Sequence, residues 1–460
     1  MAKPSLPQGT RDFGPDVVRK RNFIFNTIKS VFELYGFQPL ETPAMENLET
    51  LMGKYGEEGD KLIFKILNNG LDNADKETQI REDFEKVLQG KNIKGITERA
   101  LKYDLTIPFA RYVAMNHGQL SFPFKRYQIQ PVWRADRPQR GRYREFYQCD
   151  ADVVGSTSLF NEVELALIYH VVFNRLGIKN YELKINHRKI LTALAELCGG
   201  AGKMTDIAIA IDKLDKIGLD KVKEELKQRG LNEQQLDIIE KYLAIDGSNA
   251  EKIKALNDLI GSTDTGKKGI EEITYLNSAL RTHHPIAIGS QLSIDPTLAR
   301  GLNYYTGIIF EAKAPAEVKI GSIGGGGRYD DLTGLFGVPN IPGVGISFGV
   351  DRIYDVMEEL NLFPADIHVG TQVLFFNLGE NESKAAFTLM QQLRNKNIRC
   401  ELFHESVKFD KQFKYAEKKN IPYAVIIGSK ELEDRSCTIK NLLQNSQQTI
   451  SQQELLNYKF

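Results

Sequence analysis

The chain has 460 residues, 42% of them hydrophobic and 26% charged, with 60 basic and 60 acidic side chains. Two to four domains are expected at roughly one per 150 residues, and no apolar run approaches the roughly 20 residues that a membrane span requires. The zero net charge gives no support for non-specific nucleic-acid binding, although it is compatible with a local basic surface. The four cysteines lie far apart without a CxxC pair, which fits a reduced, cytoplasmic protein without a disulfide framework or a zinc site.

A helix and a short strand come first in the predicted order of elements. Apolar residues recur at helical spacing from Val18 to Leu34, and Gly36 ends the helix. Residues 37–43 then predict a strand that Pro43 ends. The pair fits either core packing or a dimer-forming element, and the spacing does not decide between them.

An exposed insertion is predicted next. Residues 68–94 are polar and charged, with few apolar residues at helical spacing, which indicates a partly helical surface segment. Residues 101–108 predict a short strand that leads into a helix, Phe109 to Asn116. Asp104 and Thr106 lie two apart at the end of this strand, so both side chains can face one cleft.

The most informative stretch is a long predicted hairpin over residues 124–155. At the strand period of two, each strand presents one polar face, formed by Arg126, Gln128, Gln130 and Arg134 in the first and by Phe146, Gln148, Asp150 and Asp152 in the second. Between Lys125 and Arg144 there are seven basic residues and one acid, Asp136. This arginine density indicates a site for a phosphate-bearing anion. A solvated basic hairpin is the alternative, since charge runs usually mark solvated faces.

After the hairpin the pattern changes twice. Lysine- and glutamate-rich helical segments follow one another from residue 187 to 288, which indicates a small helical domain inserted between strands of the main one. From Ile367 strands alternate with helices, which predicts a separate α/β domain. The predicted domains are a core of residues 1–186 and 289–360, a helical insertion of residues 187–288, and an α/β domain of residues 366–460.

Two glycine-rich stretches lie among the later strands, which resume at 291–295 and 300–312. Residues 321–327 read GSIGGGG, and such a backbone can approach a ligand or a neighbouring strand closely. No Gly-Lys-Ser/Thr follows, so this is not a Walker loop. Residues 343–352 match a dinucleotide fingerprint only loosely. They predict a strand and a helix beginning near Gly349, with Arg352 in its first turn.

Three arginines and several aromatic residues are candidate ligand contacts. Arg134, Arg300 and Arg352 lie on predicted strands or at a helix start, where guanidinium groups are well placed to grip phosphate oxygens. Phe146 could stack on a base. Other candidate side chains could accept hydrogen bonds or form aromatic walls: Asp104, Gln148, Asp152, Tyr304, Tyr305 and Tyr329. Taken singly, such tyrosines are more often packed strand residues, and such arginines more often form surface ion pairs.

The order of these motifs resembles class II aminoacyl-tRNA synthetases, and specifically the histidyl-tRNA synthetase family. The second class II motif is matched by residues 133–146 (WRADRPQRGRYREF), the third by residues 343–352, and the first ends at Pro43. Histidine-specific signatures are matched by residues 298–305 (LARGLNYY) and 325–330 (GGGRYD). Several family-specific motifs therefore coincide, and the resemblance spans nearly the whole chain.

The resemblance implies an α+β catalytic domain, with an antiparallel sheet of six or seven strands flanked by helices. It also implies a helical insertion, a C-terminal α/β anticodon-binding domain, and a homodimer formed through the first motif. The implied activity is that of a ligase, which activates L-histidine with ATP and transfers it to the 3′ end of tRNA(His). Mg²⁺ accompanies ATP, and no side chain is assigned to a metal.

The resemblance also assigns roles by position. Arg134 and Arg300 are the catalytic residues, on opposite sides of the ATP α-phosphate. The ATP-binding positions are Arg134, Asp136, Arg142, Phe146 and Arg352. The histidine-binding positions are Asp104, Thr106, Arg134, Gln148, Asp152, Arg300, Tyr304, Tyr305 and Tyr329. The loop residues expected to contact the tRNA acceptor stem are Arg137, Gln139 and Arg140.

Two departures and two competing interpretations accompany this resemblance. Asn303 stands where the family usually has Asp, and Asp104-Leu105-Thr106 is the form of one branch. A non-catalytic regulatory or histidine-sensing relative is the alternative function, but such proteins tend to lack the arginines of the second motif or the C-terminal domain, and this chain has both. A synthetase for another amino acid is the other alternative, against which the segment RGLNYYTG argues.

Overall fold

The chain forms two compact units, Met1–Phe363 and Pro364–Phe460. The computed structural model describes residues 3–282, 288–299, 304–368 and 370–460. All four cysteines are buried, unpaired thiols. Over the described ranges, no helix combines the length and apolar character needed to cross a bilayer.

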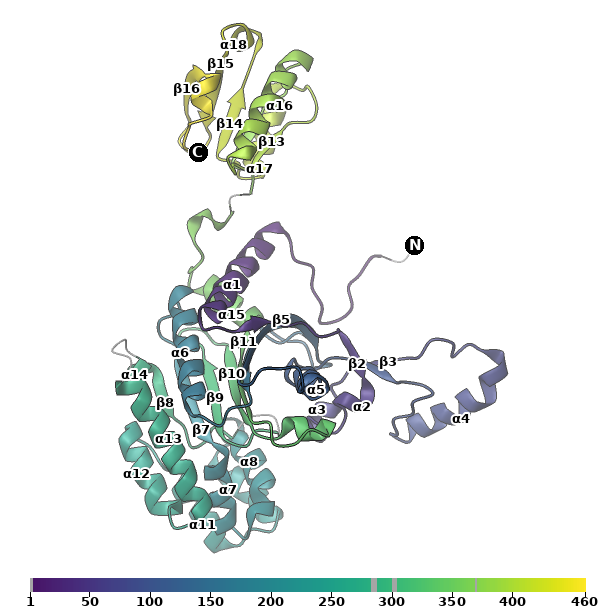
Figure 1. Cartoon of the computed structure of the whole chain (residues 1–460), viewed down its shortest axis with the longest axis vertical. Coiled ribbons are helices and arrows are strands. Elements are labelled where there is room, and N and C mark those ends of the chain that lie inside the picture. The colour runs from purple at the N-terminus through teal and green to yellow at the C-terminus, as the bar shows by residue number, and fades with distance from the viewer. Residues whose placement is uncertain (1–2, 283–287, 300–303, 369) are drawn as a thin grey trace. The chain divides into compact units, whose positions relative to one another are not determined.

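The first unit is built on an eight-stranded mixed sheet (Figure 1). Its strands, in spatial order, are β1 (Gln38–Pro39), β5 (Phe124–Trp133), β6 (Glu145–Val154), β11 (Gly343–Gly349), β10 (Gly324–Tyr329), β9 (Ile308–Lys313), β7 (Glu182–His187) and β8 (Leu292–Ile294). The six central strands are antiparallel. The antiparallel part thus has six strands, within the predicted six or seven, and short β1 and β8 add in parallel at the two edges to give eight.

Helices α1 (Pro15–Leu34), α6 (Phe160–Arg175) and α15 (Val350–Glu359) pack against β5, β6 and β11 (Figure 1). The apolar stripe of α1 explains its place, because Ile24, Ile28, Val31 and Phe32 are fully buried. The ring of Phe32 lies 5.7 Å from that of Tyr127 on β5. The face of β6 that carries Cys149, Ala151 and Val153 packs under these helices and belongs to the same core. The polar residues of β6 therefore point to the opposite face of the sheet.

Most of the glycine-rich stretch belongs to a strand. Gly324–Tyr329 forms β10, and a Cβ at Gly326 would lie 2.2 Å from the carbonyl oxygen of Gly345 on β11. The close approach is thus to a neighbouring strand. The strand β9, Ile308–Lys313, covers only the second half of the strand predicted over residues 300–312. Residues 300–303 of that prediction lie outside the described ranges.

A small sheet, β2 (Met45–Asn47), β4 (Arg99–Leu101) and β3 (Lys65–Ile66), flanks the main one, with the short helices α2 (Leu48–Leu51) and α3 (Gly56–Asp60). The predicted insertion contains a 3₁₀ turn (Ala74–Lys76) and α4 (Glu77–Leu88), which extends away from this sheet (Figure 1). The helix predicted from Phe109 begins at Thr106, as α5 (Thr106–Asn116). The reason is Asp104, whose carboxylate accepts a hydrogen bond from the Ile107 amide at 3.1 Å and so satisfies a first-turn donor.

Between β7 and β8 the chain is helical. The helices are α7 (Arg188–Leu197), α8 (Met204–Asp212), α9 (Leu214–Ile217), α10 (Leu219–Gln228), α11 (Glu233–Leu243), α12 (Asn249–Ile260), α13 (Asp264–Thr282) and α14 (Ile288–Gln291). Asn232 and Ser248 form capping boxes that fix the starts of α11 and α12. The apolar faces of these helices join the core beneath the sheet, so the structure groups them with the first unit.

The second unit is a five-stranded α/β sheet in the order β13 (Cys400–Leu402), β12 (Val373–Phe375), β14 (Tyr423–Ile426), β15 (Ser436–Asn441) and β16 (Ser446–Ser451). Its helices are α16 (Glu380–Asn395), α17 (Phe409–Lys418), α18 (Ser429–Glu433) and α19 (Gln452–Leu455). The alternation of strand and helix predicted this unit up to β14. The β15–β16 hairpin went unpredicted, because β16 is polar and exposed along most of its length.

Candidate active site

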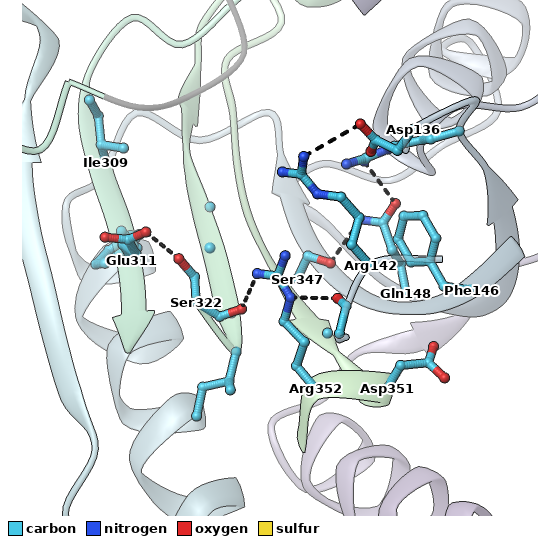
Figure 2. Close-up of a pocket in the computed structure, with 18 of the residues that line it drawn as sticks. Asp136, Arg142, Phe146, Gln148, Ile309, Glu311, Ser322, Ser347, Asp351 and Arg352 are labelled. Carbon is cyan, nitrogen blue, oxygen red and sulfur yellow. Dashed lines mark hydrogen bonds and ion pairs between the residues drawn. The ribbon is translucent and has the colours of Figure 1, made fainter. Parts of the chain in front are cut away.

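A pocket of about 650 Å³ opens on the polar face of the main sheet. Figure 2 shows wall residues from the loop between β5 and β6, from β6, β9 and β11, and from the first turn of α15. Residues of β10, α8 and α9 complete the walls. The five residues predicted to bind ATP all line it: Arg134, Asp136, Arg142, Phe146 and Arg352. Widely separated motifs thus meet in one cavity.

Arg134 follows β5 and is held by its neighbours in the pocket wall. Its Nε donates to the Tyr103 carbonyl oxygen at 3.1 Å, and its guanidinium carbon lies 4.3 Å from the centroid of the Tyr103 ring and 5.2 Å from that of Phe146. Its Nη2 is 3.5 Å from Gln148 Oε1, and Gln148 Nε2 donates to Ser347 Oγ at 2.9 Å. Stacking and hydrogen bonds together fix the direction of this cation.

Arg352 connects three parts of the pocket wall. It lies in the first turn of α15, as the sequence predicts, and its Nε donates to the Gly141 carbonyl oxygen at 2.8 Å. Its Nη1 donates to the Ser322 carbonyl oxygen at 2.7 Å. Arg142 comes from the same loop as Gly141, and its Nη1 lies 3.6 Å from Asp136 Oδ1 (Figure 2). The pocket therefore carries three arginines held by well-defined partners.

Next to the pocket lies a cluster of buried acids. Arg126 and Asp152 are cross-strand partners in the β5–β6 register, and Arg126 Nη2 is 2.8 Å from Asp152 Oδ2. The Tyr329 hydroxyl donates to Asp152 Oδ1 at 2.5 Å. Burial raises the pKa of Asp152, although the Arg126 charge and the Tyr329 hydrogen bond act to lower it. Burial likewise raises the pKa of Asp150 to about 7.

Asp104 belongs to the same cluster. It accepts hydrogen bonds from the hydroxyls of Tyr55 at 3.0 Å and Tyr304 at 3.3 Å, and burial raises its pKa. Within the described part of the chain, Asp150 Oδ1 and the Nε and Nη1 atoms of Arg126 are buried without a hydrogen-bond partner. Buried polar atoms are normally paired, so this cluster is suited to receive a polar ligand.

Tyr305 joins the cluster to the pocket. It lines the cavity, and its ring centroid lies 5.1 Å from that of Tyr304, which in turn lies 6.1 Å from that of Tyr329. A Cβ at Gly327 would approach Tyr305 Cδ1 to 3.0 Å. A glycine at this position of β10 therefore lets the tyrosine ring lie close to the strand.

The structure brings together most of the predicted site residues. Arg134, Gln148 and Tyr305 line the pocket, and the acid cluster contains Asp104, Asp152, Tyr304 and Tyr329. Thr106 is the first residue of α5. Arg300, assigned to catalysis and histidine binding, lies outside the described residues, as does Asn303.

The three residues assigned to the tRNA acceptor stem are outside the pocket walls. Gln139 and Arg142 form a backbone bridge in the loop. Arg137 and Gln139 lie in the same loop, and Arg140 pairs with Glu359 at 2.5 Å on an exposed surface.

Several pocket residues were missed from the sequence. Tyr103, Glu311, Ser322 and Ser347 line the cavity, and Glu311 accepts a short hydrogen bond from Ser322 Oγ (Figure 2). The alternation along β9 is the signal that could have marked Glu311. Asp212 and Lys216 also line the cavity, from α8 and α9, and no local pattern indicates that these helices reach the pocket. Among the residues described, no group of three or more histidine, cysteine or acidic side chains could hold a metal ion.

Comparisons with known proteins agree with this geometry. A family model described as histidyl-tRNA synthetase matches residues 76–353, more than half of the chain, and one described as an anticodon binding domain matches residues 372–458. The chain is 53% identical over 450 residues to a histidine–tRNA ligase of Christiangramia forsetii, covering 97% of each protein. It is 52% identical over 458 residues to a histidine–tRNA ligase of Bacteroides fragilis, covering 99% of this chain and 98% of that one.

Solved structures give the same result. The crystal structure of histidyl-tRNA synthetase from Nostoc sp. PCC 7120 matches with a TM-score of 0.81 and 31% identity, over 99% of each chain. A structure from Bacillus halodurans, described as an ATP phosphoribosyltransferase regulatory subunit/histidyl-tRNA synthetase, matches with a TM-score of 0.71 and 20% identity, over 90% of this chain and 97% of that one. At that identity the second likeness concerns the fold alone.

The mixed sheet with flanking helices, the arginine-lined pocket on its polar face and the separate C-terminal α/β unit define a class II aminoacyl-tRNA synthetase fold. Within that class, the family model and relatives at about half identity over nearly the full length decide the family. The chain belongs to the histidyl-tRNA synthetases.

Proposed function

We propose that this chain is a histidine–tRNA ligase. It activates L-histidine with ATP to give histidyl-adenylate and pyrophosphate, and it transfers the histidyl group to the 3′ end of tRNA(His). The single observation that carries the proposal is the junction of an arginine-lined pocket with a buried acid cluster, in a chain about 50% identical to histidine–tRNA ligases over nearly its whole length.

The pocket would hold ATP. Phe146 would offer a ring face to the adenine. The guanidinium carbon of Arg134 lies 5.2 Å from the centroid of the Phe146 ring, and this arginine would contact the α-phosphate. Arg142 and Arg352 would grip the outer phosphates, with Asp136 holding Arg142 by an ion pair. Guanidinium groups suit this role because their fork of donors matches phosphate oxygens.

The acid cluster would hold the histidine side chain. Asp104 and Asp152 can accept hydrogen bonds from the imidazole nitrogens, and Tyr329 and Tyr304 fix these carboxylates through their hydroxyls. Thr106, Gln148 and Tyr305 would complete the amino-acid site. An apolar amino acid of similar size would leave the buried carboxylates unpaired, and such sites reject analogues by about 10⁴-fold or more.

The chemistry of the first step follows from these positions. A carboxylate oxygen of histidine attacks the α-phosphorus, the bond from that phosphorus to the bridging oxygen breaks, and pyrophosphate leaves. Arg134 would stabilise the charge that develops on the α-phosphate, and Arg300 is assigned to its other side. Positioning and electrostatics are sufficient for phosphoryl chemistry of this kind, without a covalent enzyme intermediate.

In the second step a ribose hydroxyl of the terminal adenosine attacks the acyl carbon, and AMP leaves. Arg137, Gln139 and Arg140, from the loop between β5 and β6, would contact the acceptor stem through its phosphates and base edges. The C-terminal unit, for which we propose the bounds 366–460, would bind the anticodon. The remaining proposed bounds are 1–186 and 289–360 for the catalytic core and 187–288 for the insertion.

Mg²⁺ is proposed as the companion of ATP. Mg²⁺ prefers oxygen ligands and is usually held by one or two carboxylates together with substrate phosphates, and the pocket offers the Glu311 carboxylate beside the Ser322 hydroxyl. The residues present therefore fit the ion. When bound, it would neutralise charge on the phosphates. We further propose a homodimer formed through α1 and β1, and a cytoplasmic location.

Histidine-dependent exchange of labelled pyrophosphate into ATP tests the function. We expect exchange with histidine and at least about a thousandfold less with other amino acids. A folded protein that binds ATP but gives no histidine-dependent exchange would refute the enzyme and favour a regulatory protein.

A further inference from the structure

The segment that precedes α1 lies against the loop between β5 and β6. The amide of Arg144 donates to the carbonyl oxygen of Gly9 at 2.9 Å, and the Arg144 guanidinium donates to that of Gln8 at 3.4 Å. Gly9 has a φ of +82°, and a Cβ there would lie 2.8 Å from Arg144 Cγ. Glycine is thus required for this close approach, and none of the catalytic steps above uses the segment.

Arg11, two residues further on, bridges two walls of the pocket. Its Nη2 forms a short ion pair with Asp351 Oδ1, and its guanidinium carbon lies 3.2 Å from the centroid of the Tyr143 ring. Asp351 lies in the first turn of α15 beside Arg352, and Tyr143 lies in the loop beside Arg142. Both Asp351 and Tyr143 line the pocket. One side chain from the N-terminal segment therefore touches both walls.

A second link runs between the same two walls. Arg352 Nε donates to the Gly141 carbonyl oxygen at 2.8 Å. A nucleotide phosphate that binds the Arg352 guanidinium would compete with this hydrogen bond. When ATP is bound, the Arg11 bridge would then be the contact that holds the loop in place.

We propose that Arg11 is a positioning residue for ATP: by bridging Asp351 and Tyr143 it holds the loop against α15, so that Arg142 and Arg352 face one triphosphate. The bridge combines a charge pair with a stacked guanidinium, an arrangement that lysine reproduces only in part. This inference rests on the proposed function, because ATP is the ligand that it assumes.

Removal of Arg11 should leave the fold intact. Asp351 Oδ1 also pairs with Arg21 Nη1 at 2.6 Å, and the Arg21 side chain is 6% exposed against 27% for Arg11. Asp351 Oδ2 accepts a hydrogen bond from the Tyr147 amide at 3.4 Å. The carboxylate thus keeps a buried partner in an Arg11→Ala variant.

The test measures ATP affinity calorimetrically in the full-length protein without histidine, for the wild type, Arg11→Ala and Arg11→Lys. Arg19→Ala is the matched control, because Arg19 pairs with Asp16 within α1, one turn apart. We expect ATP to bind about tenfold more weakly to Arg11→Ala, with an intermediate loss for Arg11→Lys and no change for Arg19→Ala. In pyrophosphate exchange, KM for histidine should stay at the wild-type value.

Two results would overturn the inference. One is an ATP affinity of Arg11→Ala within twofold of the wild type. The other is an equal weakening of ATP and histidine with a lowered thermal midpoint, which would mean a general structural role. Absence of histidine-dependent exchange in the wild type would instead refute the proposed function, and the ATP affinities would still decide the role of Arg11.

Discussion

Replacement of Tyr329 with phenylalanine removes a single hydroxyl from the acid cluster and keeps the ring. This hydroxyl donates to Asp152 Oδ1 at 2.5 Å, and Tyr329 is 3% exposed, so water cannot readily replace it. A hydrogen bond to a charged partner contributes about 1.5–3 kcal/mol. A loss of about 2 kcal/mol corresponds to roughly thirtyfold in a binding constant. Because Asp152 is proposed to hold the imidazole, we expect KM for histidine to rise by about ten- to thirtyfold.

Pyrophosphate exchange at varied histidine and fixed ATP measures this effect, and exchange at varied ATP supplies the comparison. KM for ATP should not change. Tyr181→Phe is the matched control: Tyr181 is 2% exposed, and its hydroxyl is 2.9 Å from His170 Nδ1, at a site that is not part of the pocket wall. A similar rise in KM for histidine in both variants, or no rise in Tyr329→Phe, would refute the assignment of Asp152 to histidine.

Three further predictions concern other parts of the chain. Arg352→Ala should raise KM for ATP in the exchange assay by about a hundredfold, because it removes charged hydrogen bonds to phosphate; a change under threefold would contradict its role. Burial raises the pKa of Asp150 from its ordinary 3.8 to about 7, so the fold loses stability as pH rises from about 4 to about 7 and loses no more above that value. Ligand-free Asp150→Asn should therefore melt above the wild type at pH 8, and this difference should shrink at pH 5; a difference independent of pH would contradict the shift. Residues 364–460, made as a separate chain, should unfold cooperatively by circular dichroism, because their two apolar cores draw on that unit alone; a gradual melt would count against this.

The alternation of side chains predicts which residues of one strand share a face of the sheet. Phe146, Gln148 and Asp152 were placed on one face of a strand by period alone, and β6 presents them so, with Cys149 facing the core. The start of α15 is predicted by a different pattern, a strand that runs directly into a helix near Gly349, and this places Arg352 in the first turn.

The remaining site residues depend on contacts that local sequence does not encode. The glycines of Gly324–Tyr329 are compatible with close approach either to a ligand or to a neighbouring strand, and only the pairing with β9 and β11 on both sides decides for the strand. Asp104 was expected at a strand end, and it instead helps to start α5 through the Ile107 amide. Lys216 reaches the pocket only because the helices between β7 and β8 fold back towards the sheet. Tertiary packing determines such placements, and periodicity cannot.

The reaction proposed for this chain joins histidine to tRNA(His). Incubation of the full-length protein with ATP, Mg²⁺, labelled histidine and a tRNA(His) transcript, followed by acid precipitation of the tRNA, measures that reaction directly. We predict histidyl-tRNA in the complete mixture, and background label when ATP is left out or a tRNA for another amino acid is supplied. Background label in the complete mixture, from a protein that binds both ATP and histidine, would mean that the chain is not a histidine–tRNA ligase.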